Sequence, residues 1–118
     1  MKALVALLVV AALGSGVVLR SQTAPPPSPA ARVERGRQVY AHHKCATCHQ
    51  IAKQGNSRFP LDGVASRLSA VDLRRWITDT AKMEDALPRL PAVRMSATKY
   101  RLSPADLDGL VAYLQTLK

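Results

Sequence analysis

Cysteine and aromatic residues are scarce in this chain. Among its 118 residues there are 2 cysteines, and Phe, Trp and Tyr together make up 4%. Two cysteines are too few for a disulfide-rich miniprotein. A chain with 47% apolar and 21% charged residues is also too hydrophobic to be intrinsically disordered. Because the length lies below that at which chains commonly split, we expect a single small globular domain.

Acidic residues are outnumbered by basic ones. The chain has 8 Asp and Glu against 17 Lys and Arg, which gives a formal net charge of +9 at pH 7. The basic residues are scattered, and the aromatic residues are not interleaved with them, so the pattern does not favour nucleic-acid binding. The excess charge predicts a solvated basic surface that attracts acidic protein partners or anionic lipid.

One long apolar run stands near the N-terminus, from Ala3 to Leu19, after Met1 and Lys2. As a helix it would reach roughly 26 Å, close to the thickness of about 30 Å of a membrane hydrocarbon core. No good small-x-small cleavage site follows, so residues 1–20 are predicted to be a signal anchor, with a cleaved signal peptide as the alternative. Lys2 favours a cytoplasmic N-terminus, which would place the remainder on the periplasmic side of a bacterial inner membrane, or in the soluble periplasm after cleavage.

A proline-rich segment follows at residues 21–31, which contain Pro25, Pro26, Pro27 and Pro29. Such a segment is typical of an extended polyproline linker rather than of a helix or a sheet. The folded domain is therefore predicted to comprise residues 32–118. This part holds all 8 acidic residues and every basic residue except Lys2 and Arg20.

Three helices are predicted in this domain. The first covers Arg32 to about Lys44, which is rich in good helix formers. The second begins after Ser69, whose spacing from Asp72 resembles a capping box. The third begins after Ser103 with a proline at its first position, and its apolar residues follow helical spacing. No stretch alternates apolar and polar residues for long enough to indicate a strand, so the domain is predicted to be all-α.

The connections between these helices, residues 50–68 and 79–102, are long, and the core that three helices can form is thin. Domains of this size commonly need a disulfide, a metal or a cofactor for stability.

A C-x-x-C-H motif predicts the cofactor, because this motif is the attachment signature of c-type haem. It is formed by Cys45-Ala46-Thr47-Cys48-His49. Two thiols at this spacing can each form a thioether with one vinyl group of the porphyrin. The next residue, His49, then lies under the iron as the proximal ligand. Its other ring nitrogen is expected to donate to a backbone carbonyl, which fixes the tautomer.

Three other interpretations of the motif carry less weight. A zinc site would use the two thiols, His49 and either His42 or His43, but one short segment closes a tetrahedron poorly. A dithiol redox pair would be expected between a strand and the start of a helix, whereas this motif follows a helical stretch. The third is chance occurrence. With haem bound, His42 and His43 are predicted to be solvent-exposed neighbours of the motif.

With this motif in place, the chain resembles the class I, monohaem cytochrome c family over about residues 32–118. The resemblance rests on the haem motif and on four further segments, namely Gly36 to Tyr40, Leu61-Asp62-Gly63-Val64, Leu73-Arg74-Arg75-Trp76-Ile77 and Met95 to Leu117. It implies an all-α cytochrome c fold around one covalent haem c. It also implies that Gly36 and Tyr40 pack the first helix against Leu110 and Tyr113 of the last.

Two departures from the family pattern concern the iron ligands. In the family a proline after the motif has the carbonyl that receives the proximal histidine proton. Here Pro60 is available, but the spacing fits Phe59 better, and both remain open. The family's distal methionine is commonly followed by proline, whereas Met95 is followed by Ser96, which predicts a looser ligand loop.

Met95 is predicted to be the distal ligand and Met83 to be core filler. Met95 lies in a segment that Pro88 and Pro91 keep out of helix, at the spacing from the final helix that the family shows. Met83 lies among charged residues that could continue a helix.

The apolar residues predicted to surround the haem are Leu61, Leu68, Leu73, Trp76, Ile77 and Leu102. A His/Met pair within such walls raises the reduction potential and closes the iron to small molecules. The predicted function is thus one-electron transfer to redox protein partners with acidic docking surfaces, without enzymatic activity of its own. Two alternatives are a subunit of an oxidoreductase, for example one that oxidises sulfur compounds, and a haem ligand sensor or peroxidase-like protein with an open distal site.

Overall fold

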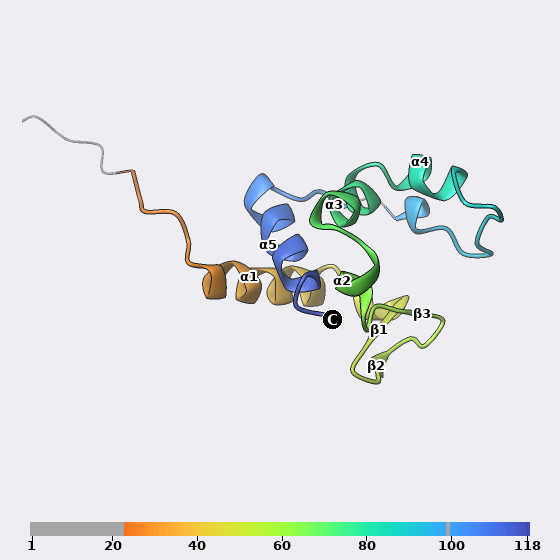
Figure 1. The fold of residues 1–118 in the computed structure, drawn as a ribbon, viewed down its shortest axis with the longest axis horizontal. Coiled ribbons are helices and arrows are strands. Elements are labelled where there is room, and N and C mark those ends of the chain that lie inside the picture. Colours follow the sequence, from red (N-terminus) through yellow and green to blue (C-terminus); the bar gives the residue numbers. More distant parts are fainter. Residues whose placement is uncertain (1–22, 99) are drawn as a thin grey trace, which may run out of the picture.

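The computed structural model describes residues 23–98 and 100–118 (Figure 1). The predicted anchor at residues 1–20 lies outside these residues, and within them no helix is long and apolar enough to cross a membrane. The elements in chain order are α1 (Pro29–His42), the 3-10 helix η1 (Cys45–Thr47), β1 (His49–Ile51), β2 (Gln54–Gly55), β3 (Phe59–Pro60), α2 (Val64–Arg67), α3 (Ala70–Thr78), α4 (Thr80–Asp85), the 3-10 helix η2 (Met95–Ala97) and α5 (Pro104–Leu114).

Helix α1 begins three residues earlier than predicted, inside the segment assigned to the linker. Ser28 is its N-cap, and the Ser28 hydroxyl accepts a hydrogen bond from the Ala31 N–H at 3.2 Å. Pro29 therefore occupies the first helical position, where the missing N–H costs nothing because no intrahelical acceptor exists there. The prediction that residues 29–31 are extended was wrong, because a proline that follows a capping serine can begin a helix as well as interrupt one.

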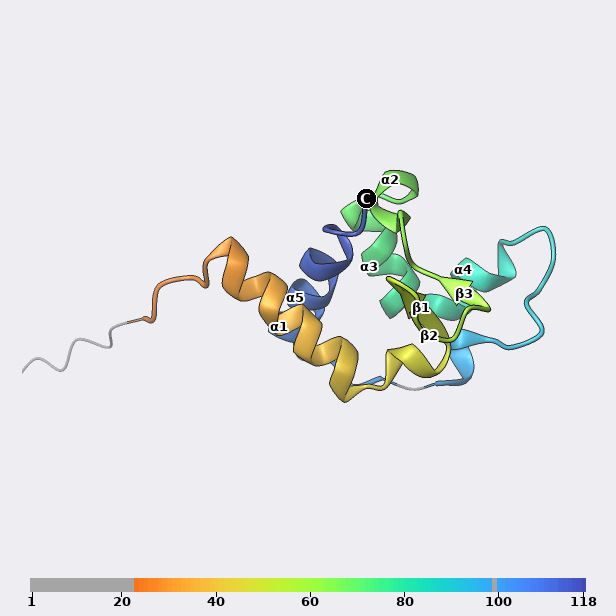
Figure 2. The ribbon, with the colours of Figure 1, turned by 90° about the horizontal axis from the view of Figure 1, so that it is seen from below.

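Helices α1 and α5 cross in close contact (Figure 2). The contact is made by Gly36 and Gly109: a Cβ added to Gly36 would lie 2.0 Å from the Gly109 carbonyl oxygen. One turn further along, the Tyr40 and Tyr113 rings meet edge to face, with centroids 5.9 Å apart. This confirms the packing implied by the family resemblance and adds Gly109, the second small residue that the close approach requires.

The N-caps of α3 and α5 are confirmed. In α3 the Ser69 hydroxyl accepts the Asp72 N–H at 3.1 Å and donates to the Asp72 carboxylate at 2.7 Å. Ser103 and Asp106 repeat this arrangement with the same distances in α5. Each pair satisfies one backbone donor of a first helical turn and places a carboxylate at the positive end of the helix.

A small sheet was not predicted. Its order is β2-β1-β3, with β1 antiparallel to β2 and parallel to β3. Each strand has only two or three residues, which is too short for an alternating pattern to show in the sequence. The fold is mostly helical, and the small sheet places His49 beside Phe59.

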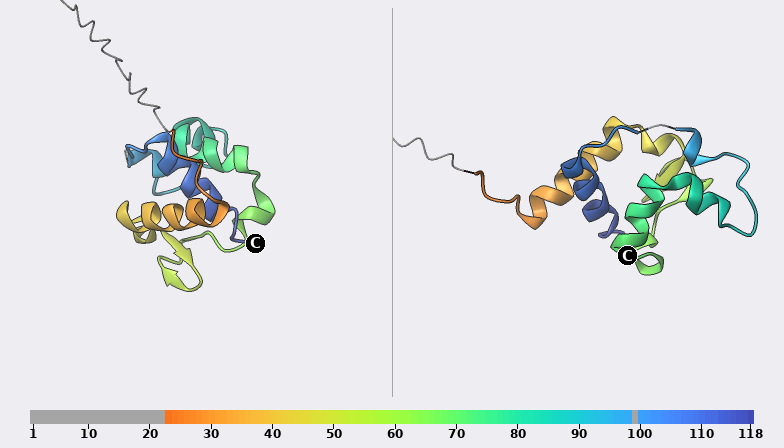
Figure 3. Two further views of the ribbon diagram at one scale, coloured as in Figure 1. Left: turned by 90° about the vertical axis from the view of Figure 1, so that its left-hand side faces the viewer. Right: turned by 90° about the horizontal axis from the view of Figure 1, so that it is seen from above.

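The apolar core lies where α1, α3 and α5 meet, and α5 runs between the other two helices (Figure 3). Its buried members are Val39, Val64, Leu73, Leu110, Val111 and Leu114. Helix α2 joins this core through Val64 and through the Ala65 N–H, which donates to the Leu117 carbonyl at 2.9 Å. The helices α1, α2, α3 and α5 thus share one apolar core, and the segment from α4 to η2 lies apart from that core.

Candidate functional site

The orientation of His49 is set by the sheet. Its partner in the parallel ladder is Phe59, and His49 Nδ1 lies 3.0 Å from the Phe59 carbonyl oxygen. Because a carbonyl oxygen only accepts, Nδ1 carries the proton and Nε2 keeps its lone pair for a metal. Of the two carbonyls that the sequence left open, Phe59 rather than Pro60 receives the bond.

Cys45 and Cys48 lie at a sharp turn after α1. The turn is made by Lys44, which adopts a left-handed conformation with φ 53° and ends the helical path. Both thiols are free; Cys45 is half-buried and Cys48 is exposed. Burial raises the pKa of the Cys45 thiol to about 11. A dithiol redox pair needs a thiolate near neutral pH, so this environment disfavours that interpretation.

Two cavities meet at His49, Trp76 and Met95. The first, of about 210 Å³, is lined by Cys48, His49, Phe59, Trp76, Glu84, Leu87, Pro91, Val93, Arg94, Met95, Thr98 and Tyr100. The second, of about 150 Å³, is lined by Tyr40, Cys45, His49, Leu61, Val64, Leu68, Leu73, Trp76, Ile77, Met95, Leu110 and Leu114. An imidazole and a thioether therefore border both cavities, and one motif cysteine lines each of them.

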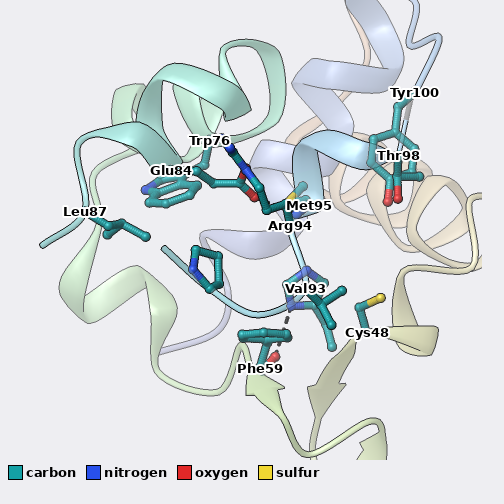
Figure 4. Close-up of a pocket in the computed structure, with 12 residues that line it drawn as sticks. Cys48, Phe59, Trp76, Glu84, Leu87, Val93, Arg94, Met95, Thr98 and Tyr100 are labelled. Carbon is teal, nitrogen blue, oxygen red and sulfur yellow. Dashed lines mark hydrogen bonds and ion pairs between the residues drawn. The ribbon is translucent and has the colours of Figure 1, made fainter. Parts of the chain in front are cut away.

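Figure 4 shows the first cavity with Met95, Glu84 and Trp76 on one side and Phe59 and Cys48 on the other. Five of the six apolar residues predicted to surround a haem line the second cavity. The sixth, Leu102, lines a smaller neighbouring cavity together with Cys45 and Met95. The predicted apolar lining is thus assembled from α3, the segments before it and the approach to α5.

The two methionines differ in position. Met95 begins the 3-10 helix η2 and lines both main cavities. Met83 lies on α4, a helix within a predicted connection, and lines neither of them. Of these two thioethers, only that of Met95 therefore lines the cavities that His49 also lines.

The two histidines before the motif, His42 and His43, differ in solvent exposure. His42 is exposed, as predicted. The prediction that His43 is also exposed was wrong: His43 is half-buried, and its ring meets the Tyr100 ring edge to face with centroids 5.6 Å apart. Across the part of the chain that the structure describes, no three His, Cys, Asp or Glu side chains gather as a zinc site would require.

Glu84 is the residue that sequence reasoning missed. Its side chain is buried, with the residue 1% exposed, and it lines the first cavity. Burial by itself would raise the pKa of Glu84, but hydrogen bonds from Ser96, Arg94 and the Met95 N–H lower the pKa to about 2. Lys82 and Asp85, which lie close to it in the sequence, are exposed, and no local signal distinguishes Glu84 from them.

Comparison with known families now decides the identity of the chain. A sequence model of the family described as cytochrome c matches residues 33–118. The chain belongs to the cytochrome c family. Cytochrome c-554(547) of Halothiobacillus neapolitanus is 34% identical to it over 87 residues, which cover 70% of this chain and 93% of that protein. No solved structure matches the chain.

Membership of the cytochrome c family implies covalently bound haem c, and the residues present fit that group. The thiols of Cys45 and Cys48 are free, and His49 has an uncommitted ring nitrogen. Met95 offers a soft thioether donor, which suits iron in an apolar surrounding. The second cavity is lined almost entirely by apolar side chains, as a porphyrin face requires. In this cytochrome c the donor set and the walls therefore agree with the family's cofactor.

Proposed function

We propose that this cytochrome c is a one-electron carrier with one haem c, attached through Cys45 and Cys48 and ligated by His49 and Met95. The observation that carries the proposal is that His49 and Met95 both border the two cavities, while each cysteine borders one. Haem c, when bound, supplies an iron that takes up and releases one electron. An iron held by two side-chain ligands would have no coordination position free for a substrate. This supports electron transfer rather than catalysis.

The remaining residues of the site orient the His49 ring and keep water away from the haem. The Phe59 carbonyl holds the His49 ring in one tautomer and one orientation, which increases its basicity as a ligand. The apolar side chains of the second cavity exclude water and disfavour the additional positive charge of the oxidised state. The apolar surrounding and the thioether ligand favour a raised reduction potential.

The partners are proposed to be redox proteins with acidic docking surfaces. The first cavity opens among exposed side chains, namely Cys48, Leu87 and Val93. Exposed apolar groups at that opening and a net charge of +9 favour a brief, salt-sensitive encounter with an acidic surface. Association is expected to slow as ionic strength rises.

The location is proposed to be the periplasmic side of a bacterial inner membrane, with residues 1–20 as the anchor. Support comes from the length of the Ala3 to Leu19 run and from the lack of a good cleavage site after it. Expressed in a Gram-negative host, the intact protein should fractionate with membranes and keep Met1 to Arg20, as mass spectrometry would show. Recovery of a soluble periplasmic form that begins near Ser15 or Ala24 would identify the segment as a cleaved signal peptide.

The covalent attachment has its own test. After denaturation in acid acetone, the haem should stay with the chain, because two thioether bonds survive conditions that break iron ligation. The optical spectrum of the native protein in both oxidation states should report a low-spin iron with a c-type haem. Haem that extracts into the acetone phase would contradict the attachment.

Variants of the motif separate attachment from ligation. Cys48→Ala should retain the haem through one thioether, with an absorption maximum shifted by the unreacted vinyl group. His49→Ala should yield little folded holoprotein, because cofactor binding and folding are coupled in a domain with so thin a core.

A further inference from the structure

One buried charge lies beside the proposed distal ligand. Glu84 is the single buried charged residue among residues 23–98 and 100–118. It belongs to α4, a helix of six residues whose neighbouring side chains Lys82 and Asp85 are exposed. A buried carboxylate is costly unless hydrogen bonds replace its hydration, so its partners indicate its role.

All four hydrogen bonds to Glu84 come from three consecutive residues. Oε1 accepts from the Met95 N–H at 2.5 Å and from the Ser96 N–H at 3.2 Å. Oε2 accepts from the Ser96 hydroxyl at 2.6 Å and from Arg94 Nε at 2.8 Å. The carboxylate thus binds the backbone of Met95 itself and both of its neighbours.

The presence of Ser96 after Met95 has a physical explanation here. The sequence predicted a looser ligand loop, because a proline would restrict the backbone at this position. Serine instead provides two donors that proline lacks, its N–H and its hydroxyl, and both bind Glu84. Where the family has a proline ring, this chain thus has two hydrogen bonds from Ser96 to a buried carboxylate, so the departure at Ser96 does not by itself predict a loose loop.

Arg94 compensates the negative charge of Glu84 and also bonds to a carboxylate at the surface. Its Nε donates to Glu84, while its Nη2 donates to the exposed Asp85 at 2.7 Å. The Asp85 bond touches neither Met95 nor Ser96. It therefore offers a neighbouring ion pair of the same type that lacks the connection to the ligand loop.

We propose that Glu84 is a positioning residue that holds the Met95 loop so that the thioether stays at the distal side of the haem iron. This rests on the proposed function, in which Met95 is the distal ligand. The carboxylate acts through the backbone of Met95 and Ser96, and does not touch the iron. Loss of Glu84 should weaken Met95 ligation more than it weakens the fold as a whole.

The test is competition between Met95 and added imidazole for the ferric iron of the holoprotein. Glu84→Gln keeps the shape but replaces one acceptor oxygen with a donor that faces Ser96 or Arg94. Imidazole should then bind about ten-fold or more tightly, because hydrogen bonds to a charged group are among the strongest in proteins. The ferric iron–thioether charge-transfer band should weaken in parallel.

Two further variants make the result specific. Ser96→Ala removes one of the four bonds and should tighten imidazole binding by a smaller factor of about three to ten. Asp85→Asn removes the exposed ion pair with Arg94 and should change imidazole binding by less than about two-fold. If Glu84→Gln fails to fold, Ser96→Ala still tests the proposal. In the double variant the two effects should be less than additive, because they break a shared network.

Several outcomes would overturn the proposal. One is unchanged imidazole affinity in Glu84→Gln and Ser96→Ala, and another is an equal change in Asp85→Asn. A third is a lower denaturation midpoint without a change in imidazole affinity, which would show a purely structural role. If Met95→Ala abolishes the charge-transfer band and Glu84→Gln has no effect, only the positioning role is lost. If the band survives in Met95→Ala, the ligand assignment is wrong and the positioning role fails with it.

Discussion

Replacing Gly36 with Ala should destabilise the protein by about 3 kcal/mol or more, although alanine is the better helix former by about 1 kcal/mol. The added Cβ would lie 2.0 Å from the Gly109 carbonyl oxygen, 2.5 Å from its carbonyl carbon and 2.6 Å from the Tyr113 Cβ. None of these atoms can rotate away, because all belong to the backbone or are fixed to it. Helices α1 and α5 would therefore have to separate, and the Tyr40–Tyr113 contact would open with them.

The measurement is guanidinium denaturation of the ferric holoprotein, followed by helical circular dichroism. Gly109→Ala is the matched control, because its Cβ would lie 3.1 Å from the Arg32 carbonyl oxygen and the Gly36 nitrogen and 3.2 Å from the Arg35 Cβ. Those contacts are tight but can be relieved by a few tenths of an ångström, so Gly109→Ala should cost clearly less than Gly36→Ala. A Gly36→Ala protein as stable as the wild type would contradict the close crossing.

The sequence predicted the parts of the fold that depend on local patterns. Ser69 and Ser103 were identified as caps from their spacing to an acidic residue three positions later, and both make the expected bonds. The haem motif is likewise a local pattern, because it depends only on the spacing of two cysteines and a histidine. The start of α1 was placed too late, because Pro29 is compatible with a spacer as well as with a first helical position.

The remaining features depend on residues distant in the sequence. The spacing fitted Phe59 better than Pro60 as the acceptor for His49 but left both open, and the parallel register of β1 and β3 selects Phe59. Glu84 lies in a charged stretch, and its burial follows from Arg94 and Ser96, ten and twelve residues away. A charge that is solvated in isolation becomes buried only when such partners fold over it, so composition and periodicity do not reveal it.

The distal ligand is best tested by the pair Met95→Ala and Met83→Ala. Met95 lines both cavities together with His49, whereas Met83 on α4 lines neither. We expect Met95→Ala to abolish the ferric iron–thioether charge-transfer band completely and to open the iron to cyanide in the ferric state and carbon monoxide in the ferrous state. Met83→Ala should leave the band and both reactions unchanged.

Each alternative ligand has its own pattern in these two variants. Loss of the band in Met83→Ala alone would transfer the assignment to Met83, and α4 would then have to turn its half-buried face toward His49. No change in either variant would point to His42 or His43. Of these, His43 is the nearer candidate, because it lines a small cavity together with Cys45 and Met95, whereas His42 is exposed. Substitution of His43 by Ala would then reproduce the opening of the iron, and with Met95 as the ligand it should not.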